Sequence, residues 1–124
     1  MILRWIFTMN DFRRGDIVAV LFPYSDHKTV KQRPALVVQA DSLRTEFSQL
    51  IVAQITSKTV RAGRPSRIMV RLGDPLAAGT GLKSDSVIVA DNLATVEHSL
   101  IRRTLGKMPD MSPVDTALRK ALAL

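Results

Sequence analysis

Two apolar runs separated by a polar segment dominate the first third of the chain. Residues 17–22 (IVAVLF) are apolar at every position, so a strand formed there buries both of its faces, and Pro23 ends it. The second run, residues 35–38 (ALVV), follows Pro34. Because proline has no amide hydrogen, Pro34 is expected at the start of that strand. The polar residues 24–31 between the two runs predict a loop.

The middle of the chain continues this β-rich pattern. Further strands are predicted at residues 49–55, 66–72 and 85–90, with a return to the sheet at 104–108. Residues 73–81 hold three glycines and a proline and predict a loop. Short helical turns are expected at residues 41–47 and 99–103, and His98, which is given no functional role, is expected to begin the second one.

Only the last segment has a clear helical period. Its apolar positions form one stripe: Val114, Ala117, Leu118, Ala121 and Leu122. Ser112 is the predicted cap, Pro113 suits the first helical position, and Asp115 completes a pattern like a capping box. The stripe is expected to close a small, mainly β barrel.

Composition narrows the classes of function. A chain of 124 residues is one domain with a modest core. Its 18 Lys and Arg against 11 Asp and Glu give a net charge of +7, which favours a polyanionic partner, although a merely soluble basic protein has the same excess. The absence of cysteine excludes disulfides and thiolate metal sites, and two histidines far apart argue against a transition-metal site or cofactor. These features fit a reducing cytoplasm.

The first 13 residues (MILRWIFTMNDFR) stand apart from the rest. Their apolar run is too short for a signal-peptide core or a membrane span, so no membrane association is expected. They are either a short arm that packs on a partner or an upstream extension, with Met9 as the true start. Residues 14–124 are expected to form the single domain.

Five motifs follow one another along that domain. They are R-G-D-I-V-x-V-x-F-P at 14–23, K-x-R-P-A-L-V-V at 31–38, A-Q-I-T-S at 53–57, G-L-K-S-D-S-V-I-V-A-D at 81–91 and T-V-E-H-S-L-I-R-R-T-L-G-K-M at 95–108. Together they resemble the PemK/MazF family of toxin endoribonucleases from bacterial toxin-antitoxin pairs. The resemblance implies an SH3-like barrel of five to seven strands, of the CcdB/MazF type, with short helices and a C-terminal helix. It also implies a homodimer, neutralised by a cognate antitoxin that blocks the groove for single-stranded RNA or mRNA.

Cleavage of RNA needs no external nucleophile. The ribose 2′-hydroxyl attacks the adjacent phosphorus when a base removes its proton and an acid protonates the departing 5′-oxygen. An arginine stabilises the added negative charge, because its planar fork binds two phosphate oxygens. The resemblance gives this role to Arg33 in a metal-independent reaction. From the residue alone, an arginine that pins the loop to a neighbouring carboxylate is the more common interpretation, and the resemblance reverses that preference.

Two further catalytic residues follow from the resemblance. Thr56 matches a functional threonine whose hydroxyl binds a phosphate oxygen, although Thr-Ser after a strand is commonly turn chemistry. Part of the family uses an arginine and an aspartate two residues apart as acid and base. Asp91 matches the aspartate, but Val89 stands at the arginine's position, so the general acid stays unassigned. His27 supplies a titratable proton near neutral pH, or is simply an exposed loop histidine.

Substrate contacts are expected along a run of cations with no carboxylate between them: Lys58, Arg61, Arg64, Arg67 and Arg71. The alternatives are a solvated basic hairpin and a surface for an acidic antitoxin segment. Splayed bases are expected in pockets near the loop 24–32. The predicted RNA-binding set is His27, Lys31, Ser57, Lys58, Arg61, Arg64, Asp85 and Ser86.

Two other functions fit the same fold. One is a toxin like CcdB, which binds DNA gyrase without cutting nucleic acid. The other is a degenerate family member that binds DNA or antitoxin and regulates its own operon, as the toxin-antitoxin complex also would by binding operator DNA. The combination of Arg33 and Thr56 favours the nuclease.

Overall fold

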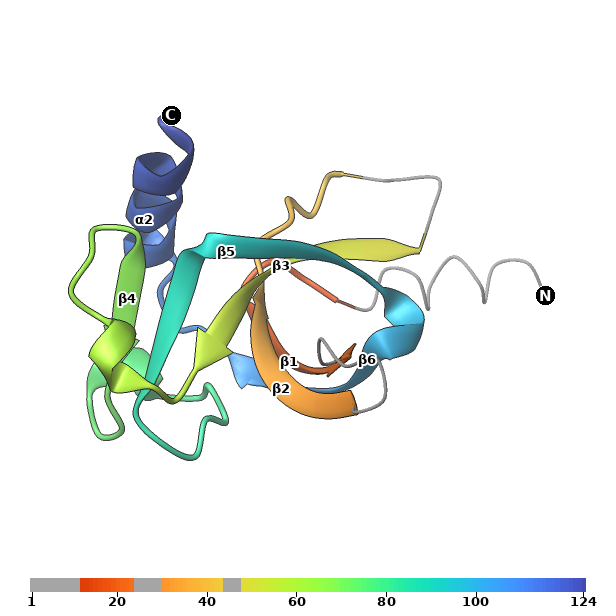
Figure 1. Ribbon diagram of the computed structural model, residues 1–124, viewed down its shortest axis with the longest axis horizontal. Coiled ribbons are helices and arrows are strands. Elements are labelled where there is room, and N and C mark those ends of the chain that lie inside the picture. Colours follow the sequence, from red (N-terminus) through yellow and green to blue (C-terminus); the bar gives the residue numbers. More distant parts are fainter. Residues whose placement is uncertain (1–11, 24–29, 44–47) are drawn as a thin grey trace.

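Six antiparallel strands form one sheet in the spatial order β4-β5-β3-β2-β1-β6 (Figure 1). The computed structural model describes residues 12–23, 30–43 and 48–124. The strands are β1 (Asp16–Pro23), β2 (Val30–Val37), β3 (Gln49–Thr56), β4 (Arg67–Val70), β5 (Ser86–Glu97) and β6 (Ile101–Lys107). Three 3-10 helices, η1 (Thr59–Arg61), η2 (Pro75–Ala77) and η3 (His98–Leu100), and one α-helix, α2 (Ser112–Leu122), complete the described elements.

Both faces of the sheet carry core, as the unbroken apolar run of β1 predicted. Ile17 lies in a first core cluster with Leu36, Ile55, Ile88 and Val114. Its neighbours Val18 and Val20 belong to a second core cluster on the opposite face, with Ala35, Val37, Val52 and Val96. Since successive side chains of a strand point to opposite faces, one short strand contributes to two cores.

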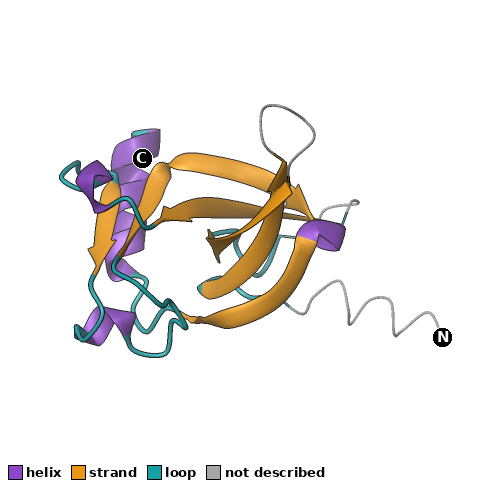
Figure 2. Ribbon diagram, turned by 60° about the horizontal axis from the view of Figure 1, so that its bottom comes forward, coloured by secondary structure: helices purple, strands orange, loops and turns teal. Residues whose placement is uncertain are grey.

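The sheet curls, but strand pairing does not close it (Figure 2). β4 and β6 stand at its two ends, and among the described strands neither pairs with the other. The expectation of a mainly β fold with a C-terminal helix is therefore confirmed, and the closed barrel is not. Helix α2 packs against β5 and β4, where Val114 and Ala117 are buried.

The start of α2 differs from the prediction. Ser112 is the first helical residue, so Met111 occupies the cap position, and its side chain makes no capping hydrogen bond. Instead, the carboxylate of Asp110 accepts a hydrogen bond of 2.9 Å from the backbone N–H of Ser112. The helix start has no side-chain capping bond of the predicted kind; Asp115 instead forms an ion pair with Arg14, Oδ1 to Nη2 2.8 Å, which ties the helix to the residues just before β1. Leu122, the last residue of the predicted stripe, is 52% exposed.

Pro34 lies inside β2 and not at its start, so that prediction was wrong. Val38 donates its N–H to the carbonyl of Ile51 in β3. Alternate residues of a strand face the same neighbour, so the nitrogens of Leu36 and Pro34 also face β3. β2 pairs with β3 only from Ala35 to Val37. The missing amide hydrogen of Pro34 therefore falls just outside the paired region, where it costs no ladder bond.

Other predicted boundaries also shift. The strand expected at 85–90 extends to Glu97, and the strand expected at 66–72 shortens to Arg67–Val70. The second helical turn begins at His98 and ends before β6 starts at Ile101. Predictions for residues 1–11, 24–29 and 44–47 fall outside the described residues. Within the described part, no helix is long and apolar enough to cross a bilayer.

Two glycines allow the β4–β5 connection to lie directly on β6. A Cβ added to Gly81 (φ +74°) would lie 2.1 Å from the carbonyl oxygen of Leu105, and one added to Gly106 would lie 2.3 Å from that of Gly79. The N–H of Lys107 donates to the carbonyl of Gly79 at 2.9 Å. Only glycine permits this approach, which fixes residues 79–82 beside the end of β6.

Candidate functional site

Arg33 and Thr56 lie just beyond the paired part of two neighbouring strands. β2 and β3 pair through Ala35 with Gln54 and Val37 with Val52. The pairing ends at Ala35, and Arg33 and Thr56 are each two residues beyond that last pair. Alternate residues of a strand project to the same face, so both lie on the face of the second core cluster.

Thr56 is more enclosed than the sequence suggested. The residue is only 5% exposed, and its hydroxyl accepts a hydrogen bond of 3.2 Å from the backbone N–H of Lys58. This bond is the turn chemistry that a Thr-Ser pair after a strand predicts. The hydroxyl keeps its own hydrogen, which it can donate to a phosphate oxygen while accepting from Lys58.

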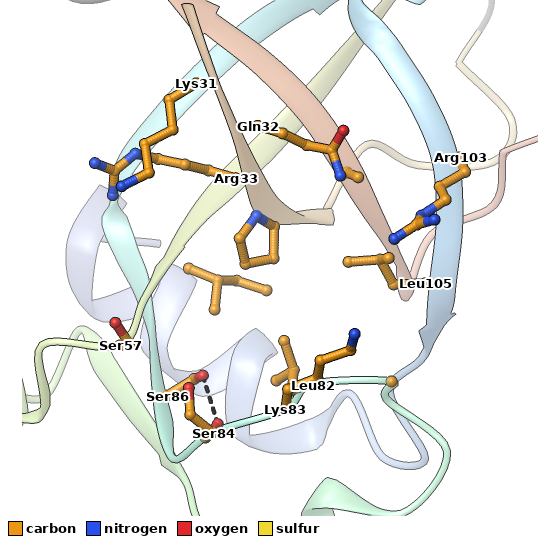
Figure 3. Close-up of a pocket in the computed structure, with 14 residues that line it drawn as sticks. Lys31, Gln32, Arg33, Ser57, Leu82, Lys83, Ser84, Ser86, Arg103 and Leu105 are labelled. Carbon is orange, nitrogen blue, oxygen red and sulfur yellow. Dashed lines mark hydrogen bonds between the residues drawn. The ribbon is translucent and has the colours of Figure 1, made fainter.

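Arg33 is half-buried and also stands at the rim of a pocket, which we call the basic pocket. The pocket has a volume of about 360 Å³. Its lining residues are Ala19, Lys31, Gln32, Arg33, Pro34, Ile55, Ser57, Gly81, Leu82, Lys83, Ser84, Ser86, Arg103 and Leu105. Figure 3 shows Arg33 and Lys31 directed to one side of β2, with Gln32 directed towards Arg103 across the pocket.

Sequence reasoning missed four of the polar lining residues: Gln32, Lys83, Ser84 and Arg103. They come from β2, the β4–β5 connection and β6, so nothing in their local sequence links them. It did select Lys31, Ser57 and Ser86, which the structure places in this pocket. Ser86 is buried, and its hydroxyl donates to the carbonyl of Ser84 at 2.9 Å.

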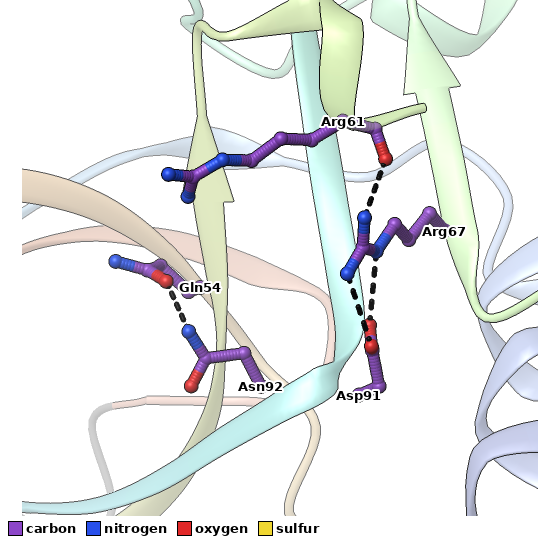
Figure 4. A network of polar contacts seen from close by, with 5 residues as sticks. All are labelled: Gln54, Arg61, Arg67, Asp91 and Asn92. Atoms are coloured by element: carbon purple, nitrogen blue, oxygen red, sulfur yellow. Dashed lines mark hydrogen bonds and ion pairs between the residues drawn. The ribbon is translucent and has the colours of Figure 1, made fainter. Parts of the chain in front are cut away.

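Asp91 forms an ion pair with Arg67 (Figure 4). Nε and Nη2 of Arg67 lie 3.3 and 3.2 Å from the two carboxylate oxygens, and Nη1 donates to the carbonyl of Arg61 at 2.8 Å. The hydrogen bonds from Arg67 hold the pKa of Asp91 below its usual value. A carboxylate with a lowered pKa accepts protons less readily, which weakens the predicted role of Asp91 as a general base.

An amide pair lies between this ion pair and Thr56. Nδ2 of Asn92 donates to Oε1 of Gln54. Asn92 directly follows Asp91 in β5, and Gln54 precedes Thr56 by two residues in β3. Figure 4 shows the guanidinium of Arg61 extending towards the same side of β3 as Gln54. Gln54 is half-buried and Asn92 is exposed, so the polar face continues from Thr56 along β3 and β5.

The predicted run of cations lies on the β3–β4 connection and β4. Four of these cations are exposed: Lys58, Arg61, Arg64 and Arg71. Arg67 instead forms the ion pair with Asp91. Val60, inside η1 on the same connection, is 91% exposed. Asp85 does not line the basic pocket within the described residues; its Oδ1 accepts a hydrogen bond of 2.8 Å from the N–H of Leu72. His27 lies outside the described residues.

The part of the chain that the structure describes contains no cluster of potential metal ligands. No three His, Asp or Glu side chains there lie close enough to hold a metal ion.

Comparison with known proteins decides the family. The model of the PemK-like, MazF-like toxins of type II toxin-antitoxin systems matches residues 13–122. The chain belongs to this family. A curated relative, Endoribonuclease EndoA of Bacillus subtilis strain 168, is 30% identical over 115 residues, which are 90% of this chain and 95% of EndoA.

Solved structures of this toxin family share the fold. Mycobacterium tuberculosis toxin MazF-mt6 superimposes with a TM-score of 0.66 at 25% identity, over 90% of this chain and 98% of that one. A mycobacterial endoribonuclease in complex with its cognate antitoxin gives a TM-score of 0.71 at 21% identity, over 91% and 96% of the two chains. MazE-MazF (Form-III) from Deinococcus radiodurans gives 0.67 at 22% identity, over 91% and 97%.

Proposed function

We propose that this protein is the toxin of a type II toxin-antitoxin pair and a sequence-selective endoribonuclease that cleaves single-stranded RNA without a metal ion. The observation that supports the proposal is that Arg33 of β2 and Thr56 of β3 both lie two residues beyond the last pair that joins these neighbouring strands, Ala35 with Gln54. A family match over residues 13–122 and a relative named as an endoribonuclease support it.

In the proposed reaction, the ribose 2′-oxygen attacks the adjacent phosphorus as its proton passes to a base. The bond from phosphorus to the 5′-oxygen then breaks, and that oxygen takes a proton. The products are a 2′,3′-cyclic phosphate and a 5′-hydroxyl. Arg33 binds the oxygens that gain charge in the transition state, and Thr56 donates to a non-bridging oxygen.

Asp91 takes a different part in this proposal from the one the sequence suggested. Its ion pair with Arg67 makes it an anchor for β4 and for the connection that carries Arg61. The exposed Lys58, Arg61 and Arg64 then offer phosphate contacts along the RNA backbone.

Partners follow from the same proposal. One solved relative is a complex of an endoribonuclease with its cognate antitoxin, and another is a MazE-MazF structure. We expect this chain to form a homodimer in the cytoplasm, to bind an antitoxin through its basic surface, and to contact operator DNA as that complex. Size-exclusion chromatography with light scattering, with and without the antitoxin, measures the first two associations, namely dimerisation and antitoxin binding.

Incubation of the purified protein with a long single-stranded RNA in EDTA tests the function. We expect discrete fragments that end in cyclic phosphate. Arg33→Ala should slow cutting by about 100-fold or more, the usual cost of removing a transition-state donor. Arg102→Ala, an exposed arginine of β6 that does not line the basic pocket, is the matched control.

Two results contradict the proposal. Equal cutting by wild type and Arg33→Ala would show that the site is wrong. Intact RNA together with inhibited gyrase supercoiling would instead support a toxin that binds its target without cutting RNA.

A further inference from the structure

A β-bulge in β5 places Asp91 beside the cations of the β3–β4 connection. The register of β3 against β5 shifts between Ala53 and Gln54, so residues 90–92 of β5 fall outside the pairing of these two strands. Bulges of this kind re-aim side chains and are common next to functional sites. The carboxylate of Asp91 accordingly meets Arg67, the first residue of β4.

Hydrogen bonds hold the bulge on both sides of Asp91. The N–H of Ala90 donates to the carbonyl of Ser66 at 2.9 Å, and Nδ2 of Asn92 donates to Oε1 of Gln54. The backbone and the two neighbouring residues therefore fix the position of the Asp91 carboxylate before any ligand binds.

Arg67 shares one small area of the surface with two exposed arginines. Its backbone N–H donates to the carbonyl of Arg64 at 3.0 Å, and its Nη1 donates to the carbonyl of Arg61 at 2.8 Å. Arg61 and Arg64 are exposed and are among the residues proposed to contact phosphates. An RNA backbone that binds these two side chains therefore passes within reach of Arg67.

Arg67 differs from these two neighbours because a carboxylate covers it. Its Nε and Nη2 lie 3.3 and 3.2 Å from the oxygens of Asp91, and its side chain is 21% exposed. Figure 4 shows the guanidinium of Arg67 directed towards both the Asp91 carboxylate and the carbonyl of Arg61. Carboxylate and phosphate use the same two parallel hydrogen bonds from an arginine fork. The carboxylate of Asp91 thus occupies the place that a phosphate would take.

We propose that Asp91 masks Arg67, that is, it occupies the guanidinium and so limits how tightly this surface holds the RNA backbone. The ion pair has no net charge, so Arg67 adds nothing to the phosphate contacts of the wild-type protein. This inference rests on the proposed function, from which it takes single-stranded RNA as the ligand. It gives a role in binding to a carboxylate that the proposed reaction does not use.

Binding of uncleavable RNA tests the masking. The probe is a fluorescent 2′-O-methyl single-stranded RNA, followed by anisotropy over a series of salt concentrations. Asp91→Asn keeps the size of the side chain and removes its charge. We expect the slope of log K against log salt to become steeper by about 0.7, the value for one further phosphate contact to a single strand.

Two further variants separate masking from a change in net charge. Glu97→Gln removes the same charge from an exposed position at the other end of β5 and should leave the slope unchanged. Asp91→Asn combined with Arg67→Gln removes both charges of the pair, so the slope should return to the wild-type value. If this double variant does not fold, the comparison of Asp91→Asn with Glu97→Gln still decides the question.

The outcomes separate this inference from the proposed function. Equal slopes for wild type and Asp91→Asn, or an equal steepening by Glu97→Gln, overturn the masking alone if the protein still cuts RNA through Arg33. A steeper slope for Asp91→Asn in a protein that never cuts RNA overturns the endoribonuclease and keeps the masking. If Asp91→Asn tightens only the complex with an acidic antitoxin peptide, the masked surface takes that peptide and the assignment to RNA is wrong.

Discussion

Asp91 receives two hydrogen bonds from Arg67, and the third nitrogen of the same guanidinium donates to the carbonyl of Arg61. This arrangement ties β5 to β4 and to η1 through one side chain. If Asp91 is an anchor, Asp91→Asn should keep RNA cutting within a few-fold of wild type. A general base contributes about 100-fold or more, so a loss of that size in single-turnover rates would restore Asp91 to the base role.

The same ion pair predicts how stability depends on pH. Because the folded-state pKa of Asp91 is lowered, its contribution is fully present above the unfolded value near 3.8 and is lost as the pH falls through the lower folded-state pKa. The pair is partly exposed, so screening limits it to about 0.5 kcal/mol. Urea unfolding of wild type and Asp91→Asn should differ by that amount at neutral pH and converge in acid. A difference that grows on acidification would contradict this.

Charge alone should not replace Arg33. Arg33→Lys keeps the positive charge but loses the planar fork that binds two phosphate oxygens. We expect kcat to fall by about 10-fold or more with little change in KM, because the lost contacts belong to the transition state. Arg102→Lys provides the control. An Arg33→Lys enzyme as fast as wild type would show that a simple positive charge suffices.

The hydroxyl of Thr56 should matter for activity more than for stability. Thr56→Val keeps the shape of a buried, β-branched side chain in β3. The variant removes the acceptor for the backbone N–H of the exposed Lys58, and water can take its place. The free energy of unfolding should therefore change by less than about 1 kcal/mol. Cutting should fall about 10- to 100-fold, the usual effect of losing a hydrogen bond to a charged group. Thr56→Ser keeps the hydroxyl and should cut well; failure of the serine variant to do so would weaken the assignment.

Gly81 should tolerate no side chain. Gly81→Ala combines a left-handed backbone with a Cβ that lies 2.1 Å from the carbonyl oxygen of Leu105. Gly63→Ala carries only the backbone strain, because nothing lies within 4 Å of its added Cβ at φ +94°. Urea unfolding should show Gly81→Ala less stable than Gly63→Ala by about 1–3 kcal/mol, the usual cost of overpacking. Equal losses would show that the loop moves away from β6 without cost.

The elements that the sequence predicted well are those with a strong periodic or continuous apolar signal. β1 is buried on both faces, and the apolar run predicted that directly. The second half of β5 was missed because four of the seven residues 91–97 are polar; pairing with β3 holds its residues 93–97. Ser112 was predicted as a cap because serine is common there, whereas Asp110 forms the bond that satisfies its N–H.

The candidate site was predictable only where a motif marks it. Arg33 and Thr56 are selected from family motifs, but their position on neighbouring strands depends on the pairing of β2 with β3, which no local pattern encodes. Lys83 and Arg103 are 20 residues apart in sequence, and only the fold brings them to the lining of one pocket. Asp91 was assigned without its partner, because Arg67 is 24 residues away.

The position of Pro34 also affects how this protein meets extended chains. A sheet margin with free N–H groups is a template on which another polypeptide can add a strand and aggregate. β2 leaves β3 beside a residue that offers no donor on that side. A ligand that approaches Arg33 along this edge of β2 is therefore recognised through side chains. The missing donor of Pro34 also discourages another copy of the chain from adding a strand beside the basic pocket.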